Sequence, residues 1–126
     1  MFLNRGKILN YLNKPWREQF ELPSFDKIRI NDFLPALHEA IALARDNVEQ
    51  IVQNKAKPNF SNTVEALETS DAVLSRLGAI FFNLVGANSN SQLEAIQVEF
   101  VKNLSMFYSE VLMNKKIYSR LETLND

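Results

Sequence analysis

Glycine and proline are scarce in this chain, and their scarcity limits the folds that it can adopt. The 126 residues contain 3 glycines, at positions 6, 78 and 86, and 4 prolines, at positions 15, 23, 35 and 58. Both residue types interrupt regular structure, so the long stretches between them are free to be helical. The two-residue alternation of a half-buried strand is hard to find outside 27–30. The sequence therefore predicts an all-α fold.

Apolar residues recur every three or four positions along three long segments, as expected for helices with one buried face. The first stripe comprises Phe33/Leu34, Leu37, Ile41, Ala44, Val48 and Ile51/Val52. The second comprises Val64, Leu67, Asp71, Leu74, Leu77/Gly78, Phe81 and Leu84/Val85. The third comprises Leu93, Ile96, Phe100, Leu104, Phe107 and Val111. A shorter set predicts a fourth helix, capped by Asn114, and consists of Ile117, Tyr118, Leu121 and Leu124.

Polar residues that favour helix N-termini precede each long stripe. The first helix is predicted to begin at Asn31 or Asp32, either of which can cap it, and to end around 53–55. The second is predicted to begin at Asn62 and the third at Ser91. Each of these two positions has a glutamate three residues on (Glu65 and Glu94), which completes a capping-box pattern.

Two residues of the second stripe are unusual for a buried helix face. Gly78 costs about 1 kcal/mol relative to alanine inside a helix, so we expect it at a close contact with another helix. Asp71 is the one charged member, and we expect it to make one hydrogen bond or ion pair, with Arg76 as a candidate partner. The run 79–85 is apolar nearly all round and should be buried on several sides.

Short connections between these helices predict an antiparallel arrangement. We expect residues 31–126 to form an antiparallel bundle of three long helices plus a short C-terminal helix. Residues 1–30 are expected to form an extended N-terminal arm that packs on the bundle. The apolar residues of this arm are Trp16, Phe20, Leu22, Phe25 and Ile28.

The residue types that most often carry chemistry are rare here. The absence of cysteine excludes disulfides, thiolate metal sites and a cysteine nucleophile. The single histidine, His38, excludes a zinc site with two histidine ligands within this chain. His38 and Glu39 begin the His-Glu-x-x-His pattern of zinc peptidases, but Ala42 occupies the place of the second histidine. We therefore interpret His38 as a flanking residue of a packed helix.

Other candidate groups have simpler structural explanations. Glu65, Glu68 and Asp71 share helical spacing and could bind a hard cation, but capping, solvation and a local hydrogen bond explain them equally well. Three serines lack a histidine nearby in the sequence that could activate them: Ser70, Ser75 and Ser105. We therefore expect no catalytic, cofactor-binding or metal-binding residue in this chain.

The charge balance bears on the partners of the chain. A net charge of -1 lacks the basic excess that is usual for proteins that bind nucleic acid. Aromatic and basic residues alternate in the arm: Lys7, Tyr11, Lys14, Trp16, Arg17, Phe20, Phe25 and Lys27. Such alternation can bind single-stranded nucleic acid, but an apolar arm that docks on a domain produces the same pattern, and the overall charge favours docking. No apolar stretch is long enough for a signal peptide or a transmembrane helix, so the cytoplasm is the expected location. Residues 2–13 could form a basic amphipathic helix on a membrane surface, as an alternative to a frayed or packed N-terminal arm.

Eight short motifs in a fixed order resemble a known family. They are Pro23–Ile28 (PSFDKI), Phe33–Leu37 (FLPAL), Pro58–Thr63 (PNFSNT), Glu65–Glu68 (EALE), Leu74–Leu77 (LSRL), Phe81–Leu84 (FFNL), Ala87–Asn90 (ANSN) and Leu93–Ile96 (LEAI). Together they resemble the zinc metallopeptidase family of thimet oligopeptidase, oligopeptidase A and peptidyl-dipeptidase Dcp. The sequence looks most similar to the Dcp branch, and the resemblance runs from about Pro15 to Leu124.

The resemblance implies a cytoplasmic enzyme, several times longer than this chain, that cleaves short peptides in a deep channel. Members of the Dcp branch release dipeptides from the C-terminus of a peptide. In the family, zinc is held by the two histidines of His-Glu-x-x-His and a later glutamate, and the glutamate of the motif activates the zinc-bound water. All of these lie downstream of the matched region, so no site residue is carried over. The resemblance implies that the N-terminal helices restrict entry to the channel and support closure.

We therefore expect an N-terminal segment of a peptidyl-dipeptidase-like enzyme that contributes to the channel wall and is inactive alone. Asn88 and Asn90 are candidates for lining the channel. The expected partners are the remainder of the parent peptidase and its short peptide substrates. Apolar faces on 79–85 and 100–112, which the rest of the whole enzyme would cover, should be partly exposed in this chain and favour self-association. The alternatives are a free-standing helical interaction module and a truncated product with no activity of its own.

Overall fold

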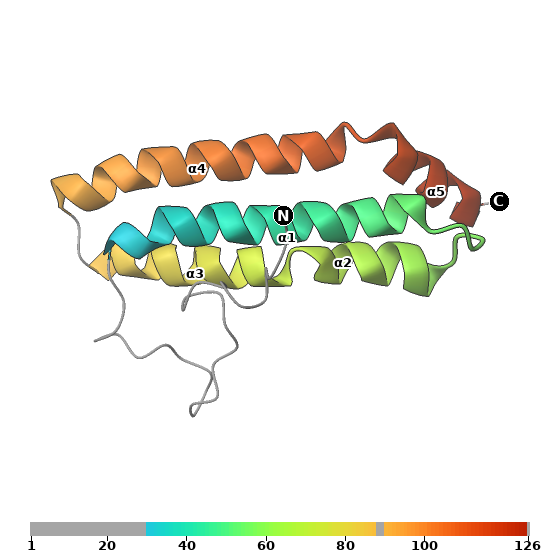
Figure 1. Cartoon of the computed structure of the whole chain (residues 1–126), viewed down its shortest axis with the longest axis horizontal. Helices are drawn as coiled ribbons and strands as arrows, with labels where there is room; N and C mark the ends of the chain where they lie inside the picture. Colours follow the sequence, from blue (N-terminus) through green and yellow to red (C-terminus); the bar gives the residue numbers. More distant parts are fainter. Residues whose placement is uncertain (1–29, 88–89, 126) are drawn as a thin grey trace, which may run out of the picture.

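Helices form nearly all of the part that the computed structural model describes, residues 30–87 and 90–125. The order is α1 (Phe33–Gln53), α2 (Ala66–Ser70), α3 (Ala72–Ala87), α4 (Ser91–Leu112) and α5 (Lys115–Asn125). In Figure 1 the chain runs along α1, returns along α2 and α3, and runs forward again along α4. No strand occurs in these residues, so the predicted all-α fold is confirmed. The predicted packing of the arm falls on residues 1–29, which lie outside the described part.

Helix α1 begins differently from the prediction. A 3₁₀ turn, η5 (Ile30–Asp32), leads directly into it. Asp32 stands at the cap position with helical backbone angles (φ -82°, ψ -17°), and its side chain makes no capping hydrogen bond. A capping side chain needs the extended backbone that this turn does not provide. The predicted end of the helix is confirmed, because Asn54 is extended (ψ 120°) ahead of the turn to Pro58.

The cap of the second helical region lies three residues earlier than predicted, at Asn59 instead of Asn62. A π-helical segment, η6 (Phe60–Glu65), precedes α2. Asn59 is extended, and its side-chain oxygen accepts a hydrogen bond from the backbone N–H of Asn62 at 2.7 Å. The Asn62 side chain accepts one from the Asn59 N–H at 2.8 Å. The capping box is therefore Asn59 with Asn62, and the predicted box of Asn62 with Glu65 is wrong.

This region is also not one continuous helix. It breaks at Asp71, whose backbone (φ -110°, ψ 21°) separates α2 from α3. The Ser70 hydroxyl donates to the Leu67 carbonyl at 2.7 Å, and the Thr69 hydroxyl lies 3.2 Å from the Glu65 carbonyl. Such hydroxyl bonds compete with the backbone hydrogen bonds of a helix and bend it. Two neighbouring back-bonding residues thus explain where the break falls.

Asparagines cap the last two helices. Asn90 is extended and accepts a hydrogen bond from the Leu93 N–H at 2.8 Å, so the helix predicted to be capped by Ser91 is capped one residue earlier. The predicted cap of the fourth helix is confirmed. The Asn114 side chain accepts from the N–H groups of Lys116 at 3.0 Å and Ile117 at 3.3 Å.

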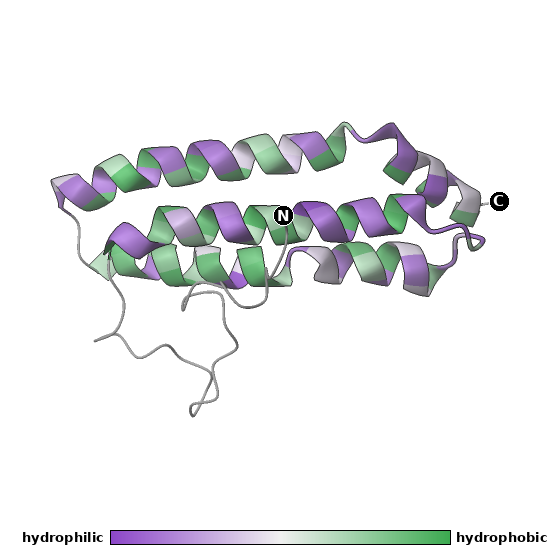
Figure 2. Ribbon diagram, viewed as in Figure 1, coloured by the Kyte–Doolittle hydropathy of each residue, from purple (hydrophilic) through white to green (hydrophobic). Residues whose placement is uncertain are grey.

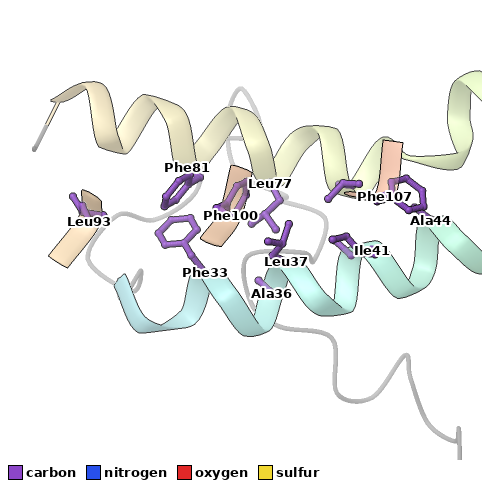
Figure 3. Packing of buried hydrophobic residues seen from close by; sticks show 12 residues of the cluster. Phe33, Ala36, Leu37, Ile41, Ala44, Leu77, Phe81, Leu93, Phe100 and Phe107 are labelled. Carbon is purple, nitrogen blue, oxygen red and sulfur yellow. The ribbon is translucent and has the colours of Figure 1, made fainter. Parts of the chain in front are cut away.

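One hydrophobic core joins the three long helical regions. Phe33 of α1, Phe81 of α3 and Phe100 of α4 are fully buried and meet near the end of the core at which α1 begins (Figure 3). The Phe33 and Phe81 rings meet edge to face at 5.0 Å, whereas those of Phe81 and Phe100 stack at 4.2 Å. Full burial of a phenylalanine contributes about 1.5 to 3 kcal/mol, so these three rings are a major source of stability. Other buried members come from the predicted stripes: Leu37, Ile41, Ala44, Leu74, Leu77, Leu93 and Phe107.

A smaller cluster holds α5 in place. Ile117 is buried against Val48 and Ile51, near the C-terminal end of α1. Figure 2 shows the alternation of hydrophilic and hydrophobic residues along each helix that allows both clusters to form.

Gly78 does not mark a close helix contact. It is buried within α3, but no heavy atom of the described residues outside its own helix backbone lies within 4 Å of where a Cβ would stand. The expectation of a helix–helix contact at this glycine is therefore wrong. The run 79–85 is buried on one side only: Phe81 lies in the core, whereas Ala79 and Phe82 are exposed.

Candidate functional site

The residues that began a zinc-peptidase pattern do not form a metal centre. His38 is exposed on α1, and Glu39 beside it is partly buried. Within residues 30–87 and 90–125, no group of three histidine, cysteine, aspartate or glutamate side chains could hold a metal ion. The donor set of this part of the chain does not fit the zinc ion that the family resemblance implies. No zinc ligand is assigned to it.

The three spaced carboxylates have separate environments. Glu65 and Glu68 are exposed, whereas Asp71 is half-buried at the helix break. Asp71 accepts a hydrogen bond from the Tyr108 hydroxyl at 2.6 Å, and this bond ties α4 to the junction of α2 and α3. Partial burial of the phenol and the bond to Asp71 raise the pKa of Tyr108 above its ordinary value. The bond partner of Asp71 is thus Tyr108, and a pairing with Arg76 remains a prediction.

The serines do not form a nucleophilic site. The Ser70 hydroxyl is nearly buried and donates to the Leu67 carbonyl. Ser75 on α3 and Ser105 on α4 are exposed on separate helices. Nucleophilic catalysis by serine needs a base within hydrogen-bonding distance of the hydroxyl. The carbonyl that holds Ser70 cannot act as one.

A polar pocket of about 390 Å³ lies between α1 and the η6–α2 segment. Asn47, Gln50 and Asn54 line it from one face of α1 and its C-cap. The opposite side is lined by Asn62, Ala66, Thr69 and Ser70, and Ile51 completes the lining. All the polar groups are amides and hydroxyls, which donate and accept hydrogen bonds without carrying charge. Such a lining can bind peptide groups but offers no pair of titratable groups for acid–base catalysis.

A buried arginine holds two of the pocket residues from the side of α5. Arg120 is only 8% exposed, and its guanidinium donates to the Asn54 carbonyl at 2.9 Å and to the Asn62 side chain at 3.1 Å. Its Nε is buried without a hydrogen-bond partner among the described residues. Arg120 therefore fixes the end of α1 and the start of η6 relative to each other. The sequence pattern missed both the pocket and this arginine, since the residues involved are 58 to 66 positions apart.

A second, smaller pocket of about 200 Å³ lies between α1 and α4. Arg45 and Glu110 cross it as a two-pronged ion pair, with both N–O distances at 2.9 Å. The Arg45 guanidinium also stands over the Phe107 ring, 6.0 Å from its centre. Because both charged groups are more than half exposed, this pair contributes little to stability and serves to orient the helices.

The predicted partial exposure of apolar residues on 79–85 and 100–112 is confirmed. Phe82, Val101, Met106, Tyr108 and Leu112 are exposed on α3 and α4.

The two residues predicted to line the channel, Asn88 and Asn90, differ in outcome. Asn90 serves as the cap of α4, and Asn88 lies outside the described residues. No helix in the described part of the chain has the length and apolar character needed to cross a membrane.

Comparisons with known proteins bear on the family. No protein-family model matches the chain. The dipeptidyl carboxypeptidase of Salmonella typhimurium is 31% identical over 105 residues, which cover 83% of this chain. The resemblance to this peptidase family is confirmed. The dipeptidyl carboxypeptidase of Escherichia coli is 28% identical over 81% of the chain, and oligopeptidase A of the same species is 27% identical over 91%.

The matches to dipeptidyl carboxypeptidase and oligopeptidase A share one further property. Each match includes most of this chain but only 15 to 17% of the length of the relative. It therefore resembles one part of a much larger peptidase.

Proposed function

We propose that this chain is a non-catalytic N-terminal segment of a zinc-dependent oligopeptidase of the peptidyl-dipeptidase type. One observation carries the proposal. In the match to the Salmonella dipeptidyl carboxypeptidase, 83% of this chain aligns with 15% of that enzyme, and 31% of the aligned residues are identical. In this proposal the remainder of the parent peptidase supplies zinc and the chemistry. The substrates of the whole enzyme are short peptides in the cytoplasm, and the products are C-terminal dipeptides.

We assign to this segment a place in the wall of the substrate channel. The polar pocket between α1 and α2 supports this role, because Gln50 and the remaining amide groups of Asn47 and Asn54 can hydrogen-bond to a peptide backbone. The Asn47 amide already donates to the Ser70 carbonyl at 3.0 Å, and the Asn54 side-chain oxygen accepts from the Ala56 N–H at 2.9 Å. Recognition of the backbone by uncharged groups admits peptides of varied side-chain charge. The rigid hold of Arg120 on Asn54 and Asn62 keeps the two sides of the pocket at a fixed separation.

A segment exchange tests the proposal. The matching segment of the Escherichia coli dipeptidyl carboxypeptidase is replaced by this chain, and dipeptide release from an N-terminally blocked tetrapeptide is measured by mass spectrometry. Retained zinc-dependent release supports the proposed role. The control carries an unrelated three-helix bundle of equal length. If this chain and the unrelated bundle support release equally poorly, the proposed role is refuted.

The same exchange tests the pocket. Gln50→Ala in the hybrid enzyme should raise KM severalfold with little change in kcat, since it removes a contact made equally in the ground and transition states. Gln53→Ala is the matched control, because Gln53 is exposed on α1 and bonds to Glu49. An unchanged KM for Gln50→Ala would refute the assignment of the pocket to the channel wall.

The isolated chain provides a further test. In the presence of added zinc it should release no dipeptide and retain no zinc after dialysis. Zinc-dependent turnover by the isolated chain would refute the non-catalytic assignment and require His38 and nearby carboxylates to be reconsidered as ligands. A specific partner bound by the isolated chain, combined with a failed segment exchange, would favour the free-standing interaction module.

A further inference from the structure

Few side chains hold α5 to the rest of the molecule. Among the described side chains of this helix, only Ile117 and Arg120 are buried, with exposed fractions of 4% and 8%. Ile117 packs with Val48 and Ile51 in the smaller cluster, which is separate from the main core that joins the three long helical regions. In Figure 1, α5 turns away from α4 and lies at the end of the bundle where α1 ends. A helix held in this way can detach while the main core stays closed.

Helix α5 is also too short to be stable without these contacts. It has 11 residues, and isolated helices of fewer than about 12 to 15 residues are marginal in water. Met113, which joins α4 to α5, is 78% exposed and belongs to neither helix. The helical order of α5 therefore depends on its contacts with α1 and η6.

The guanidinium of Arg120 connects α5 to the polar pocket. It donates to the Asn54 carbonyl at 2.9 Å and to the Asn62 side chain at 3.1 Å, and these two residues line the pocket from opposite sides. Asn62 also belongs to the capping box of η6, a π-helical segment of 6 residues, and such short segments are rarely stable by themselves. When α5 detaches, the end of α1 and the start of η6 lose the side chain that ties them together.

We infer that α5 and η6 open and close as one unit, which we call the clasp, and that the clasp determines whether the polar pocket is formed. Opening of the clasp withdraws Arg120 from Asn54 and Asn62 and leaves the main core intact. Units of this kind open at a lower free energy than the molecule as a whole. The inference concerns the 126-residue chain and does not depend on the proposed function.

Amide hydrogen exchange of the full chain, followed residue by residue by NMR at increasing urea concentrations, tests the clasp. The amides of α5 and η6 should share one opening equilibrium, and they should exchange faster than the protected amides of α1, α3 and α4 beside the main core. Their exchange should depend only weakly on urea, because opening of the clasp exposes little surface.

Two matched substitutions distinguish opening of the clasp from unfolding of the whole chain. Ile41 is buried in the main core and Ile117 in the smaller cluster, so a change to valine removes the same methyl group from each cluster. Ile117→Val should accelerate the exchange of α5 and η6 by about 2- to 10-fold. Ile41→Val should accelerate exchange in the main core by a similar factor and leave α5 and η6 unchanged, because the contacts of Ile41 remain when the clasp opens.

A third substitution tests whether the two parts of the clasp are joined. Arg120→Met removes the guanidinium and keeps an unbranched side chain, so exchange should rise by more than about tenfold in η6 as well as in α5. Tyr118→Phe is the control, because Tyr118 is exposed on α5, and it should leave exchange unchanged. Circular dichroism checks that every variant keeps its helix content.

Three results would overturn the inference. The first is an α5 whose amides exchange with the same opening equilibrium and urea dependence as the main core. The second is Ile41→Val accelerating exchange in α5 as much as in the main core. The third is Arg120→Met accelerating exchange in α5 but not in η6. All of these are measured on the chain alone, so a failure here is distinguishable from a failure of the segment exchange.

Discussion

The hydrogen bond between Tyr108 and Asp71 predicts a measurable loss of stability for Tyr108→Phe. The O–O distance of 2.6 Å is short, as expected for a hydroxyl that donates to a carboxylate. Hydrogen bonds to charged groups contribute about 1.5 to 3 kcal/mol when buried. Tyr108 is 38% exposed and Asp71 half-buried, so water can replace the lost partner. The expected loss is therefore about 1 kcal/mol, below the range for buried bonds to charged groups and typical of a protein hydrogen bond.

Urea unfolding followed by circular dichroism measures this loss. The midpoint should fall at an unchanged slope, and Tm should fall by about 4 °C for a domain of this size. Tyr118→Phe is the matched control, because Tyr118 is exposed on α5 and should lose almost nothing. Equal losses for the two variants would refute the assignment of a stabilising role to the Asp71 bond.

The remaining predictions concern pH and three helix positions. Folding raises the pKa of Tyr108, so the contribution of its neutral phenol to stability is complete below the ordinary pKa of 10.0 and declines above it. The difference in free energy of unfolding between the wild type and Tyr108→Phe should therefore shrink above pH 10. Gly78→Ala should stabilise by about 0.5 to 1 kcal/mol, since the added methyl group meets no described side chain, and a destabilised variant would contradict the free space there. Arg120→Met should cost about 2 kcal/mol, whereas Arg45→Met, at an exposed ion pair, should cost less than about 1 kcal/mol; similar losses would argue against the Arg120 contacts. Asn90→Ala should cost about 1 kcal/mol in thermal unfolding, and a neutral result would reassign the cap of α4.

Periodicity predicted most of the fold because each long helix buries a single stripe. The buried residues Phe33, Leu37, Phe81, Phe100 and Phe107 all belong to the stripes that the sequence defines. Helix periodicity depends only on neighbours along the chain, so it can be read without knowing which helices meet.

Helix starts were harder to predict because several good capping residues compete over short distances. Asn59 and Asn62 both suit a cap, and each accepts a hydrogen bond from the backbone of the other. The sequence predicts a capping box at Ser91, whereas Asn90 caps α4, and both residue types cap well. Local composition narrows such a choice to a few residues, and the cap is the one with an extended backbone, as Asn59 and Asn90 have.

The Tyr108–Asp71 hydrogen bond and the polar pocket depend on contacts that no local pattern records. Tyr108 reaches Asp71 across 37 positions, and Arg120 reaches Asn54 across 66. An arginine in a short, polar terminal helix is ordinarily a solvated residue, and nothing adjacent to Arg120 in the sequence marks it as buried. Only the packing of α5 against the end of α1 brings these groups together.

The position of Arg120 also has a consequence for synthesis on the ribosome. Helices α1, α3 and α4 can assemble their shared core as soon as α4 emerges, because Phe33, Phe81 and Phe100 are then all present. The opposite end of the bundle forms later, because Ile117 and Arg120 of α5 are translated after α4. Until they arrive, the turn that follows α1 lacks the side chain that fixes it. The bundle should therefore mature from its phenylalanine end toward its arginine end, in the opposite direction to the run of α2 and α3.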